Sequence, residues 1–212
     1  MTVTLTSFHG RGEDEIAVTF RLSDGENSSF DTFVISAASF AEMKLSVGES
    51  SRGVYEEVSE CGKVHSARKL AVSALGYGAY SRKALVRKLR VKGVEPAIAE
   101  EAVERLESSG YIDDLANAER EAERCVAKKW GARRISAALY QKEYGEEAVR
   151  NALYALEDSG VDFSENCAEL IESRYGEVPS APDARRKLYA AMIRYGYSPS
   201  EINSAIEKLN DK

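Results

Sequence analysis

The sequence is poor in the residues that build catalytic and redox sites. It contains two histidines, His9 and His65, and three widely spaced cysteines, Cys61, Cys125 and Cys167, without a C-x-x-C pair. Neither histidine lies near a cysteine or carboxylate at metal-ligand spacing, which argues against a zinc site or a Cys–His nucleophile. Phosphate-loop and G-x-S-x-G motifs are also missing. We therefore expect a protein that is not an enzyme, with no catalytic residue, cofactor or metal.

Long apolar runs are missing as well, so the sequence predicts no membrane span and no membrane partner. The N-terminal string MTVTLTSFHG lacks the basic start and apolar run of a signal peptide. An odd number of scattered cysteines is typical of free thiols in a reducing compartment. We therefore expect a cytoplasmic protein, and one without a small-molecule substrate.

Acidic residues outnumber basic ones, 35 against 29, but the two signs are unevenly distributed. Residues 1–60 hold 4 basic and 11 acidic side chains, whereas residues 61–109 hold 10 basic and 5 acidic ones. The overall acidity weakens the case for a simple DNA-binding protein, because such a domain should be clearly basic. It leaves open a local basic surface in the middle of the chain.

The first 36 residues alternate between apolar and polar side chains, as β-strands do. Three short runs, at 3–6, 16–22 and 30–35, are rich in β-branched and aromatic residues, and Asp24-Gly25 is a hairpin signal. We expect a small antiparallel sheet followed by a short helix at 37–47, which together form an N-terminal segment at residues 1–50. A helix must cover the apolar face of such a sheet, because three strands alone are marginally stable.

From residue 51 onward the pattern is helical, and it repeats. Residues 81–106 align with 131–156 at an offset of 50 and with 184–209 at an offset of 103. Apolar positions coincide in the alignment: Leu85, Ile135 and Leu188; Leu89, Leu139 and Met192; Ala102, Ala152 and Ala205. A further helix precedes each pair, around 64–76, 113–128 and 164–175. These observations predict a mainly α fold of three tandem three-helix repeats, at 51–109, 110–160 and 161–212, whose neighbours share a core.

The stretch from Gly110 to Ile135 joins the first two repeats and carries clear helix-boundary signals. Gly110 is suited to a left-handed residue just past a helix end, and Asp113 is suited to capping the next helix. That helix has a small-residue face and ends in Lys128-Lys129. The next string, Trp130-Gly131, interrupts the helical pattern before the following repeat helix.

Basic residues open the second helix of every repeat: Arg82-Lys83, Arg133-Arg134 and Arg185-Arg186-Lys187. Cations there oppose the helix dipole by ~0.3–1 kcal/mol each, so their recurrence needs a reason beyond helix stability. Lys83, Arg87 and Arg90 fall on one face of the first of these helices.

We interpret these residues as a discontinuous basic track that contacts an acidic surface or a phosphate backbone. A solvated face paired with nearby glutamates is the alternative, and Trp130 either stacks on a partner or packs into its own turn. The candidate partner-binding residues are Arg82, Lys83, Arg87, Lys88, Arg90, Lys92, Lys129, Trp130, Arg133, Arg134, Arg185 and Arg186.

Four strings in this order resemble the RecX family, bacterial regulators of the RecA recombinase. They are Leu45-x-x-Gly48 followed by a helix reaching Ala67-x-x-x-Ala71; Ser81-x-x-x-Leu85-x-x-x-Leu89-x-x-x-Gly93; Gly110-Tyr111-Ile112-Asp113-Asp114; and Lys129-Trp130-Gly131-x-Arg133-Arg134-Ile135. The likeness covers residues 45–160 by motif and 161–212 by repeat architecture. Tyr80 and Ala84 depart from the arginine and glutamate that are usual in the family.

The resemblance implies three tandem three-helix repeats in an elongated, curved molecule that needs no cofactor and is not an enzyme. It also implies binding in the groove of a RecA–DNA filament, which restrains strand exchange and ATP hydrolysis by RecA. Such a protein would modulate homologous recombination, DNA repair and the SOS response. Two other readings stay open: a direct binder of single- or double-stranded DNA that uses basic three-helix modules, and a general helical adaptor protein.

Overall fold

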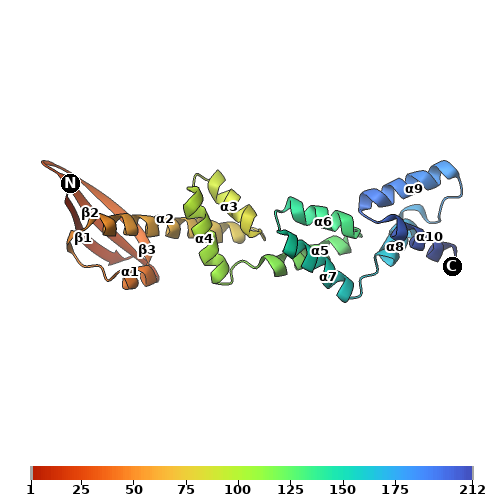
Figure 1. Ribbon diagram of the computed structural model, residues 1–212, viewed down its shortest axis with the longest axis horizontal. Helices are drawn as coiled ribbons and strands as arrows, with labels where there is room; N and C mark the ends of the chain where they lie inside the picture. Colours follow the sequence, from red (N-terminus) through yellow and green to blue (C-terminus); the bar gives the residue numbers. More distant parts are fainter. Residues whose placement is uncertain (1, 212) are drawn as a thin grey trace. The chain divides into compact units, whose positions relative to one another are not determined.

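The computed structural model describes residues 2–211, which group into two units (Figure 1). Unit 1 contains the residues up to Gly78 together with Leu85–Tyr111, and unit 2 contains Ala79–Ala84 and the residues from Ile112 onward. The described residues form ten helices and one four-stranded antiparallel sheet at the N-terminal end. The expected mainly α fold behind a small sheet is therefore confirmed. The boundaries of the three repeats stay predictions.

The sheet of unit 1 has the strand order β3-β2-β1-β4. Its strands are β1 (Thr2–Gly10), β2 (Glu15–Asp24), β3 (Asn27–Ser36) and β4 (Gly48–Ser50). The predicted hairpin at Asp24-Gly25 is confirmed, since Asp24 pairs with Asn27 and Gly25 adopts a φ of +63°. The sequence analysis missed β4 because its three residues are too few to alternate. This strand forms by pairing with Val3–Leu5 of β1.

One long helix covers this sheet. After the short helix α1 (Ala37–Met43), α2 runs without a break over Arg52–Leu75. Ser51, where the helical pattern begins, caps this helix, which also includes the repeat helix predicted around 64–76. Gly62 lies inside the helix because α2 approaches β3 closely there: a Cβ at Gly62 would lie 3.1 Å from the Cβ of Phe33. Figure 1 shows α2 starting beside the sheet and continuing toward α3 and α4.

The core beneath α2 is built from alternate strand residues, as the periodicity of the sequence predicts. Val3, Leu5, Val18, Phe20 and Ile35 are buried in the sheet, and Val58 of α2 completes this cluster. Ring contacts extend it at one side, where Tyr55 of α2 lies edge-on to Phe20 and Phe33.

The helices that follow reproduce the sequence alignment. They are α3 (Arg82–Val91), α4 (Pro96–Ser108), α5 (Asp114–Ala127), α6 (Ala132–Gln141), α7 (Glu146–Asp158), α8 (Phe163–Tyr175), α9 (Pro182–Tyr195) and α10 (Pro199–Asn210). The bounds of α6 and α7 equal those of α3 and α4 displaced by the offset of 50 residues. Every aligned apolar position given above is buried.

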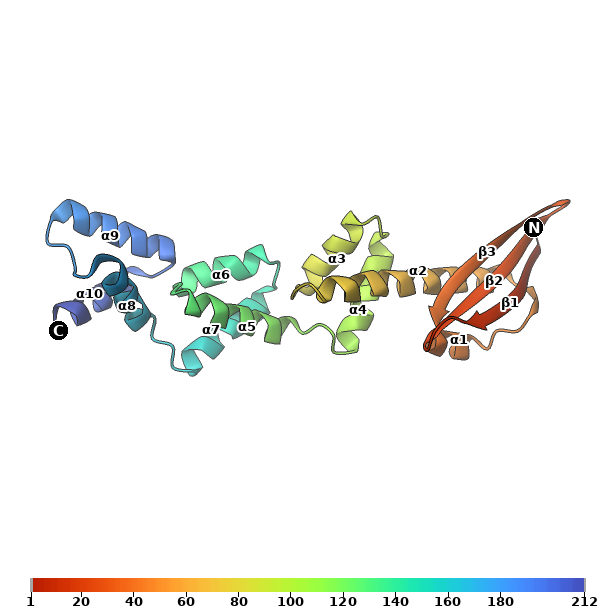
Figure 2. The same cartoon turned by 180° about the vertical axis from the view of Figure 1, so that it is seen from behind.

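Unit 2 packs its helices around one apolar core. The small-residue face predicted for α5 points inward, with Ala118, Ala122 and Cys125 buried, and α5 lies against α7. Figure 2 shows α5 and α7 together, and α10 beside α8. The predicted caps are also present: Gly110 has a φ of +74°, and the Asp113 side chain accepts a hydrogen bond from Ala116 N. These contacts hold the segments between repeat helices in defined positions.

Candidate partner-binding surface

The basic face of α3 has the geometry that its spacing predicts. Lys83, Arg87 and Arg90 are exposed, while Leu85 and Leu89 on the opposite face are buried. Arg82 and Lys88 are partly buried, and Lys92 is exposed just beyond the helix end. Within unit 1, Arg87 and Arg90 also line an open depression whose other residues come from Val91 and the α3–α4 turn, Gly93–Pro96. This face offers two guanidinium groups beside an exposed apolar side chain, Val91.

The N-terminus of α3 is capped by groups from distant parts of the chain. The hydroxyl of Ser81 accepts a hydrogen bond from Ala84 N at 3.2 Å and donates one to the Lys142 carbonyl oxygen at 2.8 Å. The Arg82 amide donates to the carboxylate of Asp114 at 2.8 Å. A carboxylate at a helix N-terminus is favoured by the dipole. Asp114 therefore offsets part of the unfavourable effect of the cations at positions 82 and 83.

The N-terminus of α6 is held at the equivalent place. Gly131, which aligns with Ser81, donates its amide to the Tyr195 carbonyl at 2.9 Å, and the Arg133 amide donates to the Gly196 carbonyl at 3.2 Å. Gly131 and Gly196 touch backbone to backbone, because a Cβ at Gly131 would lie 2.5 Å from the carbonyl carbon of Gly196. At both junctions, the second helix of one repeat begins against the turn that follows the second helix of the next repeat. The residues at the start of α3 contact the turn after α6, and those at the start of α6 contact the turn after α9.

Trp130 and Arg134 take part in a stack within unit 2. The guanidinium carbon of Arg134 lies 4.0 Å from the centroid of the Trp130 ring and 5.3 Å from that of Tyr195. Arg174 of α8 also lies 4.8 Å from the Tyr195 centroid. These contacts have the geometry of cation–π interactions. They use Arg134 and the Trp130 ring to join the start of α6 to the end of α9, and Lys128 Nζ lies over the same Trp130 ring at 5.3 Å from its centroid.

Lys129 is engaged inside unit 2 in a similar way. Its ammonium group donates to Asn166 at 2.8 Å and forms an ion pair with Glu169, both on α8. Its carbonyl accepts a hydrogen bond at 2.8 Å from the hydroxyl of Tyr197, a buried side chain whose pKa burial raises well above its ordinary value. Lys129 therefore stabilises the contact between the α5–α6 turn and α8.

The remaining candidate residues of unit 2 point outward. Arg133, Arg185 and Arg186 are exposed, and Arg186 lies 3.5 Å from the carboxylate of Asp183. The candidate set therefore divides into exposed cations on α3, α6 and α9 and a second group that joins helices within unit 2. The sequence analysis missed the contact of Asp114 with Arg82 and that of Tyr195 with Arg134 and Arg174, because these contacts join residues far apart in the chain.

The structure gives little support to a reactive centre in the part of the chain that it describes. Within residues 2–211, no three histidine, cysteine, aspartate or glutamate side chains converge as metal ligands would. Cys125 and Cys167 are buried free thiols, and burial raises the pKa of Cys167 to about 12, which disfavours the nucleophilic thiolate. None of the helices described is long and apolar enough to cross a membrane.

Comparisons with known proteins agree with this architecture. The family model for the RecX first three-helix domain matches residues 67–106. The regulatory protein RecX of Xanthomonas axonopodis pv. citri is 35% identical over 127 residues, which cover 59% of this chain and 76% of that protein. The regulatory protein RecX of Stenotrophomonas maltophilia is 32% identical over 127 residues, with the same coverage of both chains.

Two solved structures have the same fold. A crystal structure of a regulatory protein RecX aligns with a TM-score of 0.74 and 17% identity over 99% of this chain and 100% of its own. A RecX structure from Lactobacillus salivarius aligns with a TM-score of 0.62 and 21% identity over 71% of this chain and 98% of its own. The first alignment spans nearly the whole chain, so the N-terminal sheet also has a counterpart.

Proposed function

The chain belongs to the RecX family of regulatory proteins, and from this membership we propose that it regulates the RecA recombinase. In this proposal the protein binds the RecA–DNA filament in the cytoplasm and restrains strand exchange and ATP hydrolysis by RecA. It thereby modulates homologous recombination, DNA repair and the SOS response. It acts by binding and carries out no catalysis of its own.

The observation that carries this proposal is the exposed cations at corresponding positions of the three repeats. Lys83 of α3, Arg133 of α6 and Arg186 of α9 align at the offsets of the repeat, and all three side chains are exposed. A filament of RecA on DNA presents phosphates along its length, and exposed cations repeated along a chain suit such a partner. A single exposed basic residue would not support the proposal of a partner with repeated phosphates.

The contacts within unit 2 refine which residues we assign to the partner. Arg134, Lys129 and Trp130 are used in joining helices. We assign binding to the exposed group, which consists of Lys83, Arg87, Arg90, Lys92, Arg133, Arg185 and Arg186. Arg82 and Lys88 flank this group on α3.

The test is the single-stranded-DNA-dependent ATPase of the cognate RecA, titrated with the protein at low and at physiological ionic strength, about 0.15 M. We expect inhibition that weakens at the higher salt concentration. A variant with Lys83→Glu, Arg90→Glu and Arg133→Glu should inhibit at least about tenfold more weakly, since each reversed exposed contact changes binding by roughly 0.5–1 kcal/mol.

The matched control is Arg150→Glu, which reverses an exposed cation on α7 outside the candidate set. Circular dichroism establishes that all variants fold. Equal inhibition by the wild type, the triple variant and the control would show that the exposed cations do not contact the filament. Absence of inhibition by the wild type would reject the proposal itself.

Direct DNA binding is the second candidate, and the basic face of α3 is the observation that favours it. Lys83, Arg87 and Arg90 resemble the basic face of a recognition helix. A gel-shift assay with single- and double-stranded DNA and no RecA separates the two functions. A salt-sensitive shift that the triple variant loses, without any effect on RecA, would favour this candidate.

A further inference from the structure

The sheet of unit 1 has two edge strands that differ in length and in protection. β4 has only three residues, whereas β3 extends over ten residues and contains neither proline nor lysine. Proteins usually protect a sheet edge with a short strand, a proline or a lysine, because unpaired backbone groups there can bind another strand. β3 is therefore the edge of this sheet that can accept a further strand.

The pairing of β3 with β2 determines which backbone groups of β3 face outward. Ala37 N donates to the Asp14 carbonyl at 2.9 Å, which makes these two residues a hydrogen-bonded pair at the end of the ladder. Hydrogen-bonded and non-hydrogen-bonded pairs alternate along an antiparallel ladder. In this register Thr32 and Val34 belong to non-hydrogen-bonded pairs, so their N–H and C=O groups point away from β2. Among the described residues, the backbone hydrogen bonds outside the helices and strands include none from these groups.

An open groove of about 550 Å³ follows this edge. It is lined by Thr32–Val34 of β3, by residues of α2 between Gly62 and Leu70, and by Gly93–Glu95 and Ile98 at the start of α4. Figure 1 shows that α2 continues past β3 toward α4, so the groove lies over α2 between the strand edge and α4. Most of its lining is apolar. An extended chain in this groove would lie beside β3, as a further strand of the sheet does.

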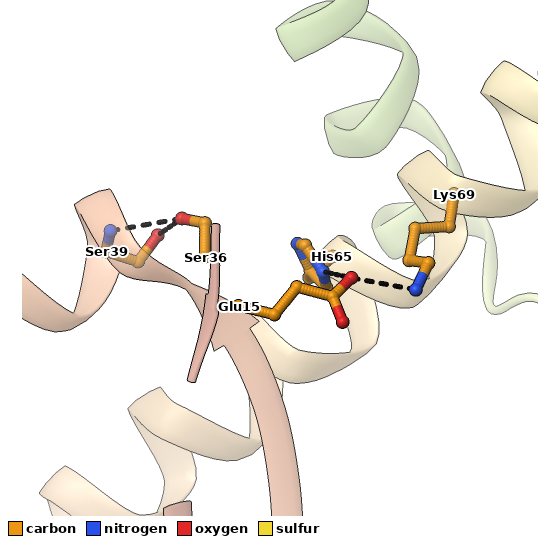
Figure 3. A network of polar contacts seen from close by, with 5 residues as sticks. All are labelled: Glu15, Ser36, Ser39, His65 and Lys69. Carbon is orange, nitrogen blue, oxygen red and sulfur yellow. Dashed lines mark hydrogen bonds and ion pairs between the residues drawn. The ribbon is translucent and has the colours of Figure 1, made fainter. Parts of the chain in front are cut away.

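Polar contacts fix the position of α2 against the sheet. The carboxylate of Glu15 on β2 lies between His65 Nε2 at 3.0 Å and Lys69 Nζ at 2.7 Å (Figure 3). Hydrogen bonding from Lys69, and then from His65, lowers the pKa of Glu15 to about 2, so this carboxylate is ionised at neutral pH. On β3, Asp31 accepts a hydrogen bond at 2.6 Å from the Tyr55 hydroxyl of α2. The groove is therefore formed before a ligand binds, which reduces the entropic cost of binding.

From this geometry we propose that the edge of β3 binds an extended peptide segment of a partner protein, which adds a fifth strand to the sheet. The peptide backbone pairs with the outward N–H and C=O groups of Thr32 and Val34. Side chains alternate between the two faces of a strand, so every second side chain of the peptide lies over Ala67, Leu70 and Ile98. The peptide therefore has apolar residues at alternate positions.

The charges of the groove set a second requirement. Lys63 of α2 and Glu95 of the α3–α4 turn both line it and are exposed, so it suits a segment with one acidic and one basic side chain. A second copy of this chain fits less well, because its β3 would bring its own α2 into the groove. None of the lining residues belongs to the candidate partner-binding set, so this site is independent of the proposed RecA regulation.

The experiment measures the fluorescence anisotropy of labelled seven-residue peptides titrated with the full-length protein. Valine alternates with threonine, glutamate and lysine in two peptides, which place the glutamate and the lysine in opposite orders. At least one should bind saturably. Backbone N-methylation of this peptide, either at the valines or at the residues between them, should weaken binding at least about tenfold in one pattern only, because alternate N–H groups of a strand face β3. Equal affinities of the two methylated forms, or no saturable binding by either peptide, would overturn the proposal.

Variants of the protein test the same contact from the other side. Thr32→Pro should weaken binding at least about tenfold, because it removes an outward N–H while leaving the bonds to β2 in place. Ser28→Pro is the matched control: its N–H has the same outward direction, but it lies beyond the groove, so binding should be unchanged. Lys63→Glu should weaken binding of the glutamate-containing peptides about two- to fivefold.

Two further measurements keep the result decisive. The N-methylation comparison uses the wild-type protein, so it tests the proposal even if Thr32→Pro fails to fold. Analytical ultracentrifugation of the wild type and Thr32→Pro tests the other occupant of the edge. A wild-type dimer that Thr32→Pro dissociates would assign the β3 edge to a second copy of this chain and would overturn the proposal.

Discussion

Replacing Gly131 by alanine should destabilise unit 2 strongly, although the backbone at this position suits any residue. Gly131 caps α6 with φ −78° and ψ 163°, an extended conformation without a left-handed requirement. The obstacle is spatial. An alanine Cβ would lie 2.5 Å from the carbonyl carbon and oxygen of Gly196 and 2.6 Å from Tyr197 N, all of them backbone atoms.

The size of the effect follows from what must move. Forcing an added methyl group into a packed contact typically costs about 1–3 kcal/mol. The displacement also weakens two hydrogen bonds, Gly131 N to Tyr195 O and Arg133 N to Gly196 O, which contribute about 0.5–1.5 kcal/mol each. We therefore expect Gly131→Ala to lower the free energy of unfolding of unit 2 by about 2–5 kcal/mol.

The assay is urea unfolding followed by the fluorescence of Trp130, the single tryptophan of the chain, which packs against the core of unit 2. With a urea dependence of about 2 kcal/mol per molar, the midpoint should fall by about 1–2.5 M. A local probe is needed because two units need not unfold in one step.

Gly145 provides the matched control. It caps α7 with φ −70° and ψ 161°, almost the same backbone as Gly131, but a Cβ there meets no atom within 4 Å. Gly145→Ala should therefore change stability by less than about 1 kcal/mol. If the two variants unfold at the same urea concentration, close backbone contact at Gly131 is not what stabilises this junction.

Two further predictions concern polar contacts. Ser81→Ala should lower the free energy of unfolding by about 2–4 kcal/mol in urea unfolding. The substitution removes the N-terminal cap of α3 and leaves the Lys142 carbonyl without its donor. An equal effect of Ser109→Ala, which removes an exposed hydroxyl, would contradict this. Glu15 has a pKa of about 2 in the folded protein against an ordinary value of 4.5, so its stabilising effect is present above pH 4.5 and is lost as the pH falls toward 2. The urea midpoints of the wild type and Glu15→Gln, measured by circular dichroism, should differ at neutral pH and converge near pH 2.5; a constant difference would refute the role of its ionised form.

Local signals in the sequence predicted the helix boundaries well where one side chain or one backbone angle decides them. Asp113 caps α5 and Gly110 is left-handed, as predicted, and Ser198 with Glu201 forms a capping box at the start of α10. Such features depend on a few neighbouring residues, so they can be read without knowledge of the fold. The repeat alignment worked for a related reason, since it compares the buried positions of one helix with those of another.

Features that depend on contacts between distant segments were not predictable in this way. Strand β4 forms because Gly48–Ser50 pairs with β1. Glycine occupies position 62 inside α2 because a Cβ there would lie only 3.1 Å from the Cβ of Phe33 on β3. The backbone conformation of Glu143 in the second repeat turn was also not predictable from its residue type. Glu143 adopts a φ of +64° at the offset where Gly93 and Gly196 also have positive φ, although glycine would be the usual residue.

The two basic residues at the start of α6 have different roles in the structure. In Arg133-Arg134, the second arginine stacks between Trp130 and Tyr195, while the first is exposed and contributes only its amide to the junction. The dipole cost of the pair is offset in part by the stack of Arg134, whereas the charge of Arg133 forms no ion pair among the residues of unit 2 that the structure describes. Arg133 is therefore an exposed cation with no assigned role within the chain, which fits the filament contact proposed above. Position 133, and by alignment positions 83 and 186, are where the proposed filament contact should be sought first.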